Sequence, residues 1–144
     1  SLMKLETGNS KLATSSKSPV KDFTDLNAWR MARELRKKVY DLTKGFPSEE
    51  KHALVSQIRR AAYSVTSNIA EGFGRFSYQE NIQFCRLARG SAFEVRDHLT
   101  TALDAGYLQQ KQWAELDELA QCAIRVLNDY IRSTKELQKL KADA

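Results

Sequence analysis

The sequence is poor in residues that interrupt helices, since its 144 residues include only 6 glycines and 2 prolines. Glycine and proline are the two residues that most disfavour helix interiors, so this scarcity favours long helices. No apolar run approaches the roughly 20 residues that a membrane-spanning helix needs. The N-terminus also lacks the apolar block of a secretory signal. These absences predict a cytoplasmic protein without a membrane partner.

Cysteine and histidine are equally scarce, with two of each. Cys85 and Cys122 fall on apolar positions of predicted helices and have no partners at metal-ligand spacing. We therefore expect reduced core thiols and neither a disulfide nor a metal site. His52 and His98 belong to no metal-binding or nucleophile motif, and no carboxylate stands on a predicted apolar seam. The sequence thus predicts no catalytic residue, no cofactor and no enzyme activity.

Acidic residues are relatively few in the first two thirds of the chain. The net charge is +5, and residues 23–96 hold 13 basic against 8 acidic residues. Residues 97–144 hold 6 basic against 8 acidic residues. A positive front half suits a polyanion such as RNA or DNA, although basicity of this size is also common in proteins that bind neither.

Residues 1–22 have no apolar period and are rich in serine, lysine and threonine. This composition predicts a disordered tail, followed by one folded domain over residues 23–144. Ser1 and Leu2 precede the first methionine and are expected to be a remnant of cloning.

Apolar residues at steps of three and four predict four helices in the folded domain. The first covers about residues 25–44 and ends before Gly45 and Pro47; the second starts with Ser48 as its N-cap and ends near Gly72. The third opens on a capping box of Ser77 and Glu80 and stops at Gly106. The fourth covers about residues 110–139, with heptad positions at Trp113, Leu116, Ala120, Ala123, Leu127, Tyr130, Thr134 and Leu137. Four such helices with short connections predict an all-α, up-down-up-down antiparallel four-helix bundle.

Several segments carry a resemblance to a known family, above all "QIRRAAYSVTSNIAEGFGR" over residues 57–75. "FTDLNAWRMA" (23–32), "VYDLTKGFPSEE" (39–50), "FCRLARGSAFEV" (84–95) and "ALDAGYL" (102–108) extend it. The chain resembles the bacterial four-helix-bundle proteins called intervening-sequence or ribosomal-like proteins, whose reading frames lie in insertions within large ribosomal RNA genes. The resemblance implies a homopentamer and kinship with accessory proteins of diversity-generating retroelements, which act with a reverse transcriptase and RNA. At Thr66 the chain departs from the family, where we expect proline.

The corner between the second and third helices, "SNIAEGFGRFSYQE", allows two interpretations. Its backbone amides and Arg75 could grip a phosphate, or its two glycines could take positive φ merely to turn the chain. We favour the second interpretation, in which the segment is a corner. Its polar residues would then bind unpaired backbone groups at the helix ends or nearby arginines, and its aromatic residues would take part in an oligomer contact. The residues concerned are Asn68, Glu71, Gly72, Phe73, Gly74, Arg75 and Phe76.

Basic residues form stripes on two of the predicted helices. Arg30, Arg33 and Lys37 lie opposite the apolar stripe of the first helix. Arginines interleaved with an aromatic ring suit phosphate contacts and stacking on unpaired bases, and the third helix offers Arg86, Arg89, Phe93 and Arg96. The same residues would also serve as a solvated face or a subunit interface.

Small residues gather within the third helix at "ARGSA", residues 88–92. They predict close helix packing, with a ligand cavity as the alternative.

Two functions are consistent with these features. The favoured hypothesis is a non-enzymatic oligomeric protein, a pentamer by its resemblance, that binds RNA or DNA through arginine-rich surfaces. The alternative is a protein-interaction adaptor that binds no nucleic acid. Phosphate binding weakens steeply with salt whereas an apolar interface does not, so a salt series separates the two.

Overall fold

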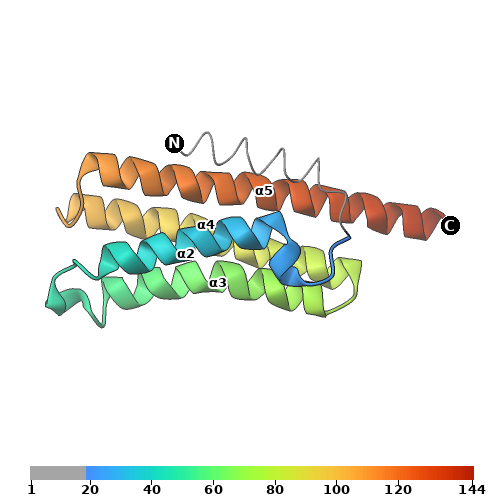
Figure 1. Cartoon of the computed structure of the whole chain (residues 1–144), viewed down its shortest axis with the longest axis horizontal. Helices are drawn as coiled ribbons and strands as arrows, with labels where there is room; N and C mark the ends of the chain where they lie inside the picture. Colours follow the sequence, from blue (N-terminus) through green and yellow to red (C-terminus); the bar gives the residue numbers. More distant parts are fainter. Residues whose placement is uncertain (1–18) are drawn as a thin grey trace.

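A computed structural model describes residues 19–144, and four long α-helices make up this part of the protein. They are α2 (Asn27–Thr43), α3 (Leu54–Gly74), α4 (Tyr78–Asp104) and α5 (Gln110–Asp143), with short 3-10 turns η1 (Phe23–Asp25) and η2 (Ser48–Glu50). Successive helices run in opposite directions (Figure 1). The described residues contain no strand, and the predicted up-down-up-down bundle is confirmed. The predicted disordered tail lies almost entirely outside the described residues.

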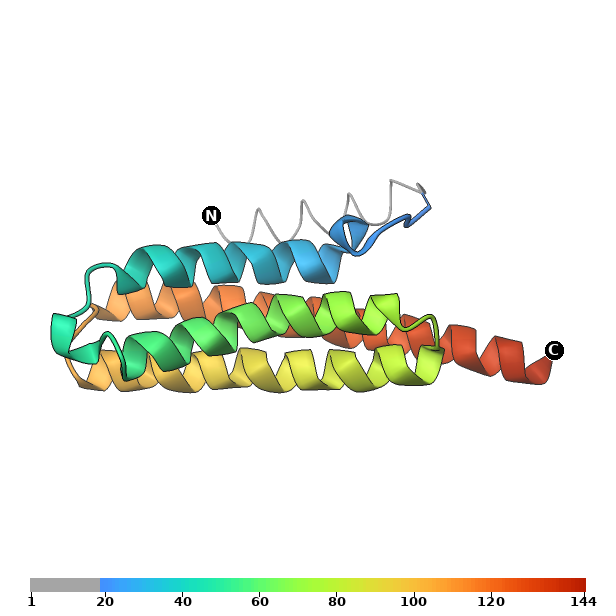
Figure 2. The ribbon, with the colours of Figure 1, turned by 90° about the horizontal axis from the view of Figure 1, so that it is seen from below.

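The four helices form a ring in cross-section. α2 and α4 each pack against both α3 and α5, so every helix has two neighbours (Figure 2). Each helix faces the shared core with one stripe of buried residues. The core residues come from all four stripes, and several of them are fully enclosed. Because each stripe is narrow, the opposite faces of the helices remain outside the core, where the exposed polar side chains lie.

The third predicted helix has the predicted boundaries. The backbone N–H of Glu80 donates to Ser77 Oγ at 3.4 Å, which is one half of the predicted capping box, and α4 follows. Gly106 ends the helix region with a φ of 80°, a conformation that glycine adopts without strain. The N-cap at Ser77 and the stop at Gly106 are therefore confirmed, because each satisfies a local need of the backbone, whereas the return bond of the capping box from Glu80 is absent.

The predicted start of the second helix at Ser48 is wrong. Ser48 begins the short turn η2, and α3 starts only at Leu54. Phe46 and Leu54 are buried in one cluster at this end of the bundle, so the chain must make a wide turn between them. Tyr107 also donates a hydrogen bond to the Glu50 carboxylate at 2.8 Å, which ties this turn to the loop between α4 and α5.

The longest helix, α5, follows its heptad pattern for most of its length. Leu116, Ala120 and Leu127 are buried as predicted. The pattern fails at Leu137, which is 49% exposed, because the last turns of α5 extend past the ends of the other described helices (Figures 1 and 2). Burial of the seam thus ends a few turns before the helix does.

Both cysteines are buried in the core as predicted, and no disulfide joins Cys85 to Cys122. Burial raises the pKa of the Cys85 thiol to about 12, so it stays protonated at neutral pH. Within residues 19–144, no three His, Cys, Asp or Glu side chains come together in a way that could hold a metal ion. In the same range, the helices are too short or too polar to cross a membrane.

We expect Leu127→Ala to lower the free energy of unfolding by about 2–5 kcal/mol, because it opens a cavity around a side chain with no exposed surface. Leu137→Ala is the matched control on the same helix and should cost well under 1 kcal/mol. Chemical denaturation of both variants measures the difference. Equal effects would contradict the register of α5.

Candidate nucleic-acid interface

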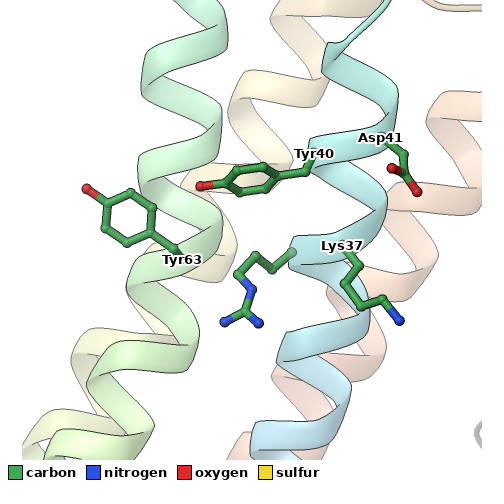
Figure 3. A pocket seen from close by; sticks show the side chains of 5 residues that line it. Lys37, Tyr40, Asp41 and Tyr63 are labelled. Carbon is green, nitrogen blue, oxygen red and sulfur yellow. The ribbon is translucent and has the colours of Figure 1, made fainter.

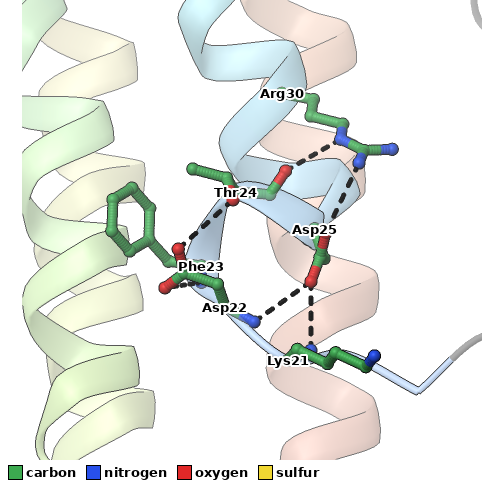
Figure 4. A network of polar contacts seen from close by, with 6 residues as sticks. All are labelled: Lys21, Asp22, Phe23, Thr24, Asp25 and Arg30. Atoms are coloured by element: carbon green, nitrogen blue, oxygen red, sulfur yellow. Dashed lines mark hydrogen bonds and ion pairs between the residues drawn. The ribbon is translucent and has the colours of Figure 1, made fainter.

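The predicted basic stripe of α2 begins at Arg30, which is tied to the preceding turn (Figure 4). Arg30 Nε donates to the carbonyl oxygen of Thr24 at 2.9 Å, and Nη2 lies 3.7 Å from the Asp25 carboxylate. Backbone N–H groups of Lys21 and Asp22 donate to the same carboxylate and lower the pKa of Asp25, so it remains ionised. The Arg30 side chain is nevertheless 57% exposed, so its guanidinium remains accessible.

The rest of the stripe is held loosely. The Arg33 guanidinium lies 5.7 Å from the centre of the Trp29 ring, and Lys37 Nζ lies 3.8 Å from Glu34. Arg33 and Lys37 are exposed, and ion pairs at exposed positions contribute little to stability. A phosphate could therefore replace these partners at low cost in free energy.

The predicted stripe of α4 is divided by the structure. Arg89 Nη1 donates to Asn128 Oδ1 of α5 at 2.8 Å. Arg96 makes two hydrogen bonds to the Asp117 carboxylate of α5, at 2.8 and 3.4 Å. These two arginines hold α4 against α5, whereas Arg86 is exposed and Phe93 is 49% exposed.

Sequence reasoning did not single out Asp117, the buried partner of Arg96. Only 5% of it is exposed, and its carboxylate also accepts a hydrogen bond from Gln121 at 2.8 Å. The sequence does contain a signal for this burial, because Asp117 directly follows Leu116, a predicted heptad position. A charge this well enclosed requires a cationic partner, and Arg96 supplies it.

Positive charge is concentrated on one pair of helices. α2 and α3 together hold seven basic and three acidic residues, whereas α4 and α5 hold nine basic and ten acidic residues. Because α2 and α3 are neighbours in the bundle, their charges reinforce each other on one side of the protein. The structure thus assigns the charge asymmetry of the sequence mainly to this pair.

An open groove of about 450 Å³ lies between α2 and α3, lined by Arg36, Lys37, Tyr40, Asp41 and Tyr63. Figure 3 shows that Tyr40 extends from α2 toward α3, with its hydroxyl end toward Tyr63. Lys37 extends on the other side of α2, away from α3. The groove therefore adjoins the α2 stripe, since Lys37 belongs to both.

Among residues 19–144, two arginines of α2 and α3 beside this groove have only neutral partners. Arg36 Nη1 donates to Thr66 Oγ1 at 3.0 Å. Arg59 donates to Thr43 Oγ1 at 2.8 Å, and its guanidinium lies 4.8 Å from the centre of the Tyr40 ring. Sequence reasoning missed this cluster, although Arg36 and Tyr40 are spaced i, i+4, as are Arg59 and Tyr63, and each pair shares a helix face.

The predicted positive φ at Gly72 and Gly74 is wrong. Both glycines lie within α3, and the residue with positive φ in this corner is Phe76, at 58°. Gly72 is needed for another reason, because a Cβ built there would lie 2.9 Å from the Phe84 Cβ and from Asn81 Oδ1 of α4. The glycine permits close approach of two helices, and the turn is made elsewhere.

The polar residues of the corner have partners within the protein. Arg75 donates to the Glu71 carboxylate at 2.9 Å, and its guanidinium lies 5.1 Å from the centre of the Phe84 ring. Asn68 donates to the Ser64 carbonyl oxygen of its own helix. These contacts support the interpretation as a corner, since Arg75 already has an anionic partner.

Two predictions about packing have different outcomes. Phe73 packs against the core, whereas Phe76 is 93% exposed and remains a candidate contact residue. Within "ARGSA", Ala88 and Ala92 are buried in the core as predicted. Gly90 instead faces open space, because no atom lies within 4 Å of a Cβ built there.

Comparisons with known proteins agree with this architecture. The family model described as 23S rRNA-intervening sequence protein matches residues 24–129. Among solved structures, one of a protein of unknown function from the S23 ribosomal protein family of Bacteroides thetaiotaomicron is similar, with a TM-score of 0.67 and 21% identity. That similarity covers 72% of this chain and 97% of the other, and at this identity it shows the fold alone. No curated protein matches the chain.

Gly72→Ala should destabilise the protein by about 1–3 kcal/mol, because the added methyl group overpacks the contact between α3 and α4. Gly90→Ala is the control, and it should be neutral or stabilise by up to about 1 kcal/mol, since alanine is preferred in an exposed helix. Thermal unfolding of the two variants ranks them. A greater loss from Gly90→Ala would refute the packing at Gly72.

Proposed function

The chain belongs to the 23S rRNA-intervening sequence protein family, and from this premise we propose a non-enzymatic, homo-oligomeric protein that binds RNA or DNA through arginine-rich surfaces. The observation that carries the proposal is the positive charge of α2 and α3, which together hold seven basic and three acidic residues. When basic side chains neutralise the phosphates of a nucleic acid, the counterions condensed on its backbone are released, and this release drives binding. The family name, which refers to a ribosomal RNA gene, is consistent with such a ligand.

The α2 stripe is better suited to this role than the α4 stripe. Arg33 and Lys37 make weak contacts with partly exposed partners and can exchange these contacts for phosphates. Arg30 is bound to Thr24 and Asp25, but its side chain is accessible to a phosphate. On α4, a phosphate contact by Arg96 would have to compete with the buried Asp117 carboxylate. Arg86 and Phe93 are the members of that stripe with exposed side chains, and they extend the proposed surface.

A protein-interaction adaptor remains the second candidate, because α4 also exposes apolar side chains. Leu87 is 53% exposed and Phe93 is 49% exposed on this helix, and Phe76 lies in the corner before it. Exposed large apolar residues are typical of surfaces that bind protein. The same residues support self-association, so the two roles share one surface.

We expect the protein to form a stable oligomer, with a pentamer as the size that the family resemblance implies. Light scattering at micromolar concentration measures the mass directly. Replacing Leu87 and Phe93 by serine together should shift the mass toward the monomer while the helical content stays constant. A wild-type monomer at this concentration would contradict the proposal.

Replacing Arg30, Arg33 and Lys37 by glutamine should weaken RNA and DNA binding and flatten its salt dependence, by about one slope unit per lost phosphate contact. The control replaces Arg132, Lys135 and Lys139 of α5 by glutamine, which removes the same charge from exposed positions on a neutral helix. Fluorescence anisotropy with labelled structured RNA, single strands and duplex DNA at several salt concentrations provides the measurement. An equal loss of affinity in the two variants would indicate that binding depends on overall charge and not on the α2 stripe. If neither the variants nor the wild-type protein bind nucleic acid, the adaptor is favoured.

A further inference from the structure

Electrostatics distinguish the groove between α2 and α3 from the rest of the basic surface. Arg36 and Arg59 are both half-buried, and in the described part of the chain no carboxylate lies within ion-pair distance of either. Their hydrogen-bond acceptors are neutral hydroxyl and carbonyl oxygens. Asp41 also lines the groove, and it lies 3.4 Å from Lys44. The groove thus has positive charge that its own residues do not neutralise, which favours an anion.

The positive charge of the groove is suited to the phosphate of a nucleotide, and its aromatic rings are suited to the base. Tyr63 is 47% exposed and projects from α3, and Tyr40 reaches toward it from α2 (Figure 3). The Arg59 guanidinium over the Tyr40 ring, together with its bond to Thr43, restrains this ring before any ligand arrives. Bases stack on exposed aromatic rings whatever their identity, because every base has a π-face.

The volume and accessibility of the groove further limit the kind of ligand that it can bind. A volume of about 450 Å³ lies within the range of roughly 300–1,000 Å³ that is usual for small-molecule sites. A base can enter such a groove only when it is unpaired, since bases within a duplex are stacked on one another and their faces are covered.

We propose that the groove between α2 and α3 binds one unpaired nucleotide of a nucleic-acid strand, with its phosphate at Arg36 and its base against Tyr63. This inference rests on the proposed function and assigns it a site. Lys37 also belongs to the α2 stripe, so the strand continues toward Arg33 and Arg30.

The first experiment compares Tyr63→Leu with Tyr78→Leu. Tyr63 is 47% exposed, and Tyr78, which lies at the start of α4 outside the groove, is 37% exposed; both changes remove a ring while keeping much of the apolar area. Anisotropy with labelled single-stranded RNA, single-stranded DNA and a duplex of the same sequence measures each affinity. Tyr63→Leu should weaken single-strand binding by roughly fivefold or more and leave duplex binding unchanged, and Tyr78→Leu should change neither by more than about twofold. Comparing the two single strands tells whether the site distinguishes ribose from deoxyribose.

A second pair tests the phosphate contact. Arg36→Gln and Lys38→Gln each remove one positive charge from α2, but only Arg36 lines the groove. We expect Arg36→Gln to weaken single-strand binding about tenfold and to lower the salt slope by about one unit, with a smaller effect of Lys38→Gln. Circular dichroism and light scattering check that the variants stay folded and assembled, and Tyr63→Leu decides the matter if Arg36→Gln unfolds.

The possible failures are distinguishable. If the wild type binds no nucleic acid at low salt, the proposed function fails and the groove site with it. If the wild type binds but both groove variants behave like their controls, the groove site is wrong while the proposed function stands. An oligomer that dissociates on Tyr63→Leu would place the groove in a subunit contact and would also overturn the inference.

Discussion

The whole bundle depends on the burial of one narrow apolar stripe from each of four helices. Side chains such as Leu35, Ile58, Leu99 and Leu127 have no exposed surface, and they come from α2, α3, α4 and α5 in turn. Apolar burial is the dominant favourable term in folding, and here it fixes the rotation of every helix about its axis. Once these rotations are fixed, each polar side chain has its place, either at a helix–helix boundary or on the outer surface.

Those boundaries use arginine in two different ways. Between α4 and α5, Arg96 meets the buried carboxylate of Asp117, so the pair is neutral and structural. Between α2 and α3, Arg36 and Arg59 donate hydrogen bonds to hydroxyl and carbonyl oxygens, and none of the described carboxylates neutralises their charge. Thr66, where the family resemblance predicts proline, accepts the hydrogen bond from Arg36.

The fold could be predicted from sequence because helix periodicity and the end signals at Ser77 and Gly106 act locally. The candidate site could be predicted only in part. Arg30, Arg33 and Lys37 are exposed as expected, but a helical wheel does not show that Arg96 reaches a carboxylate on another helix. The glycine at position 72 was misread for a similar reason, because both a turn and a tight helix contact require a residue without a Cβ.

The protruding end of α5 gives the protein two levels of stability. From Lys135 onward nearly every side chain is exposed, and the contact of Gln138 with Gln79 of α4, at 3.0 Å, lies near the point where the helix passes its neighbours. Beyond it, the turns of α5 depend mainly on hydrogen bonds of their own backbone, and short helices without tertiary packing are marginal in water. Amide hydrogens there should exchange with solvent through local fraying. The free energy of this opening should lie far below that of the cooperative unit around Leu127.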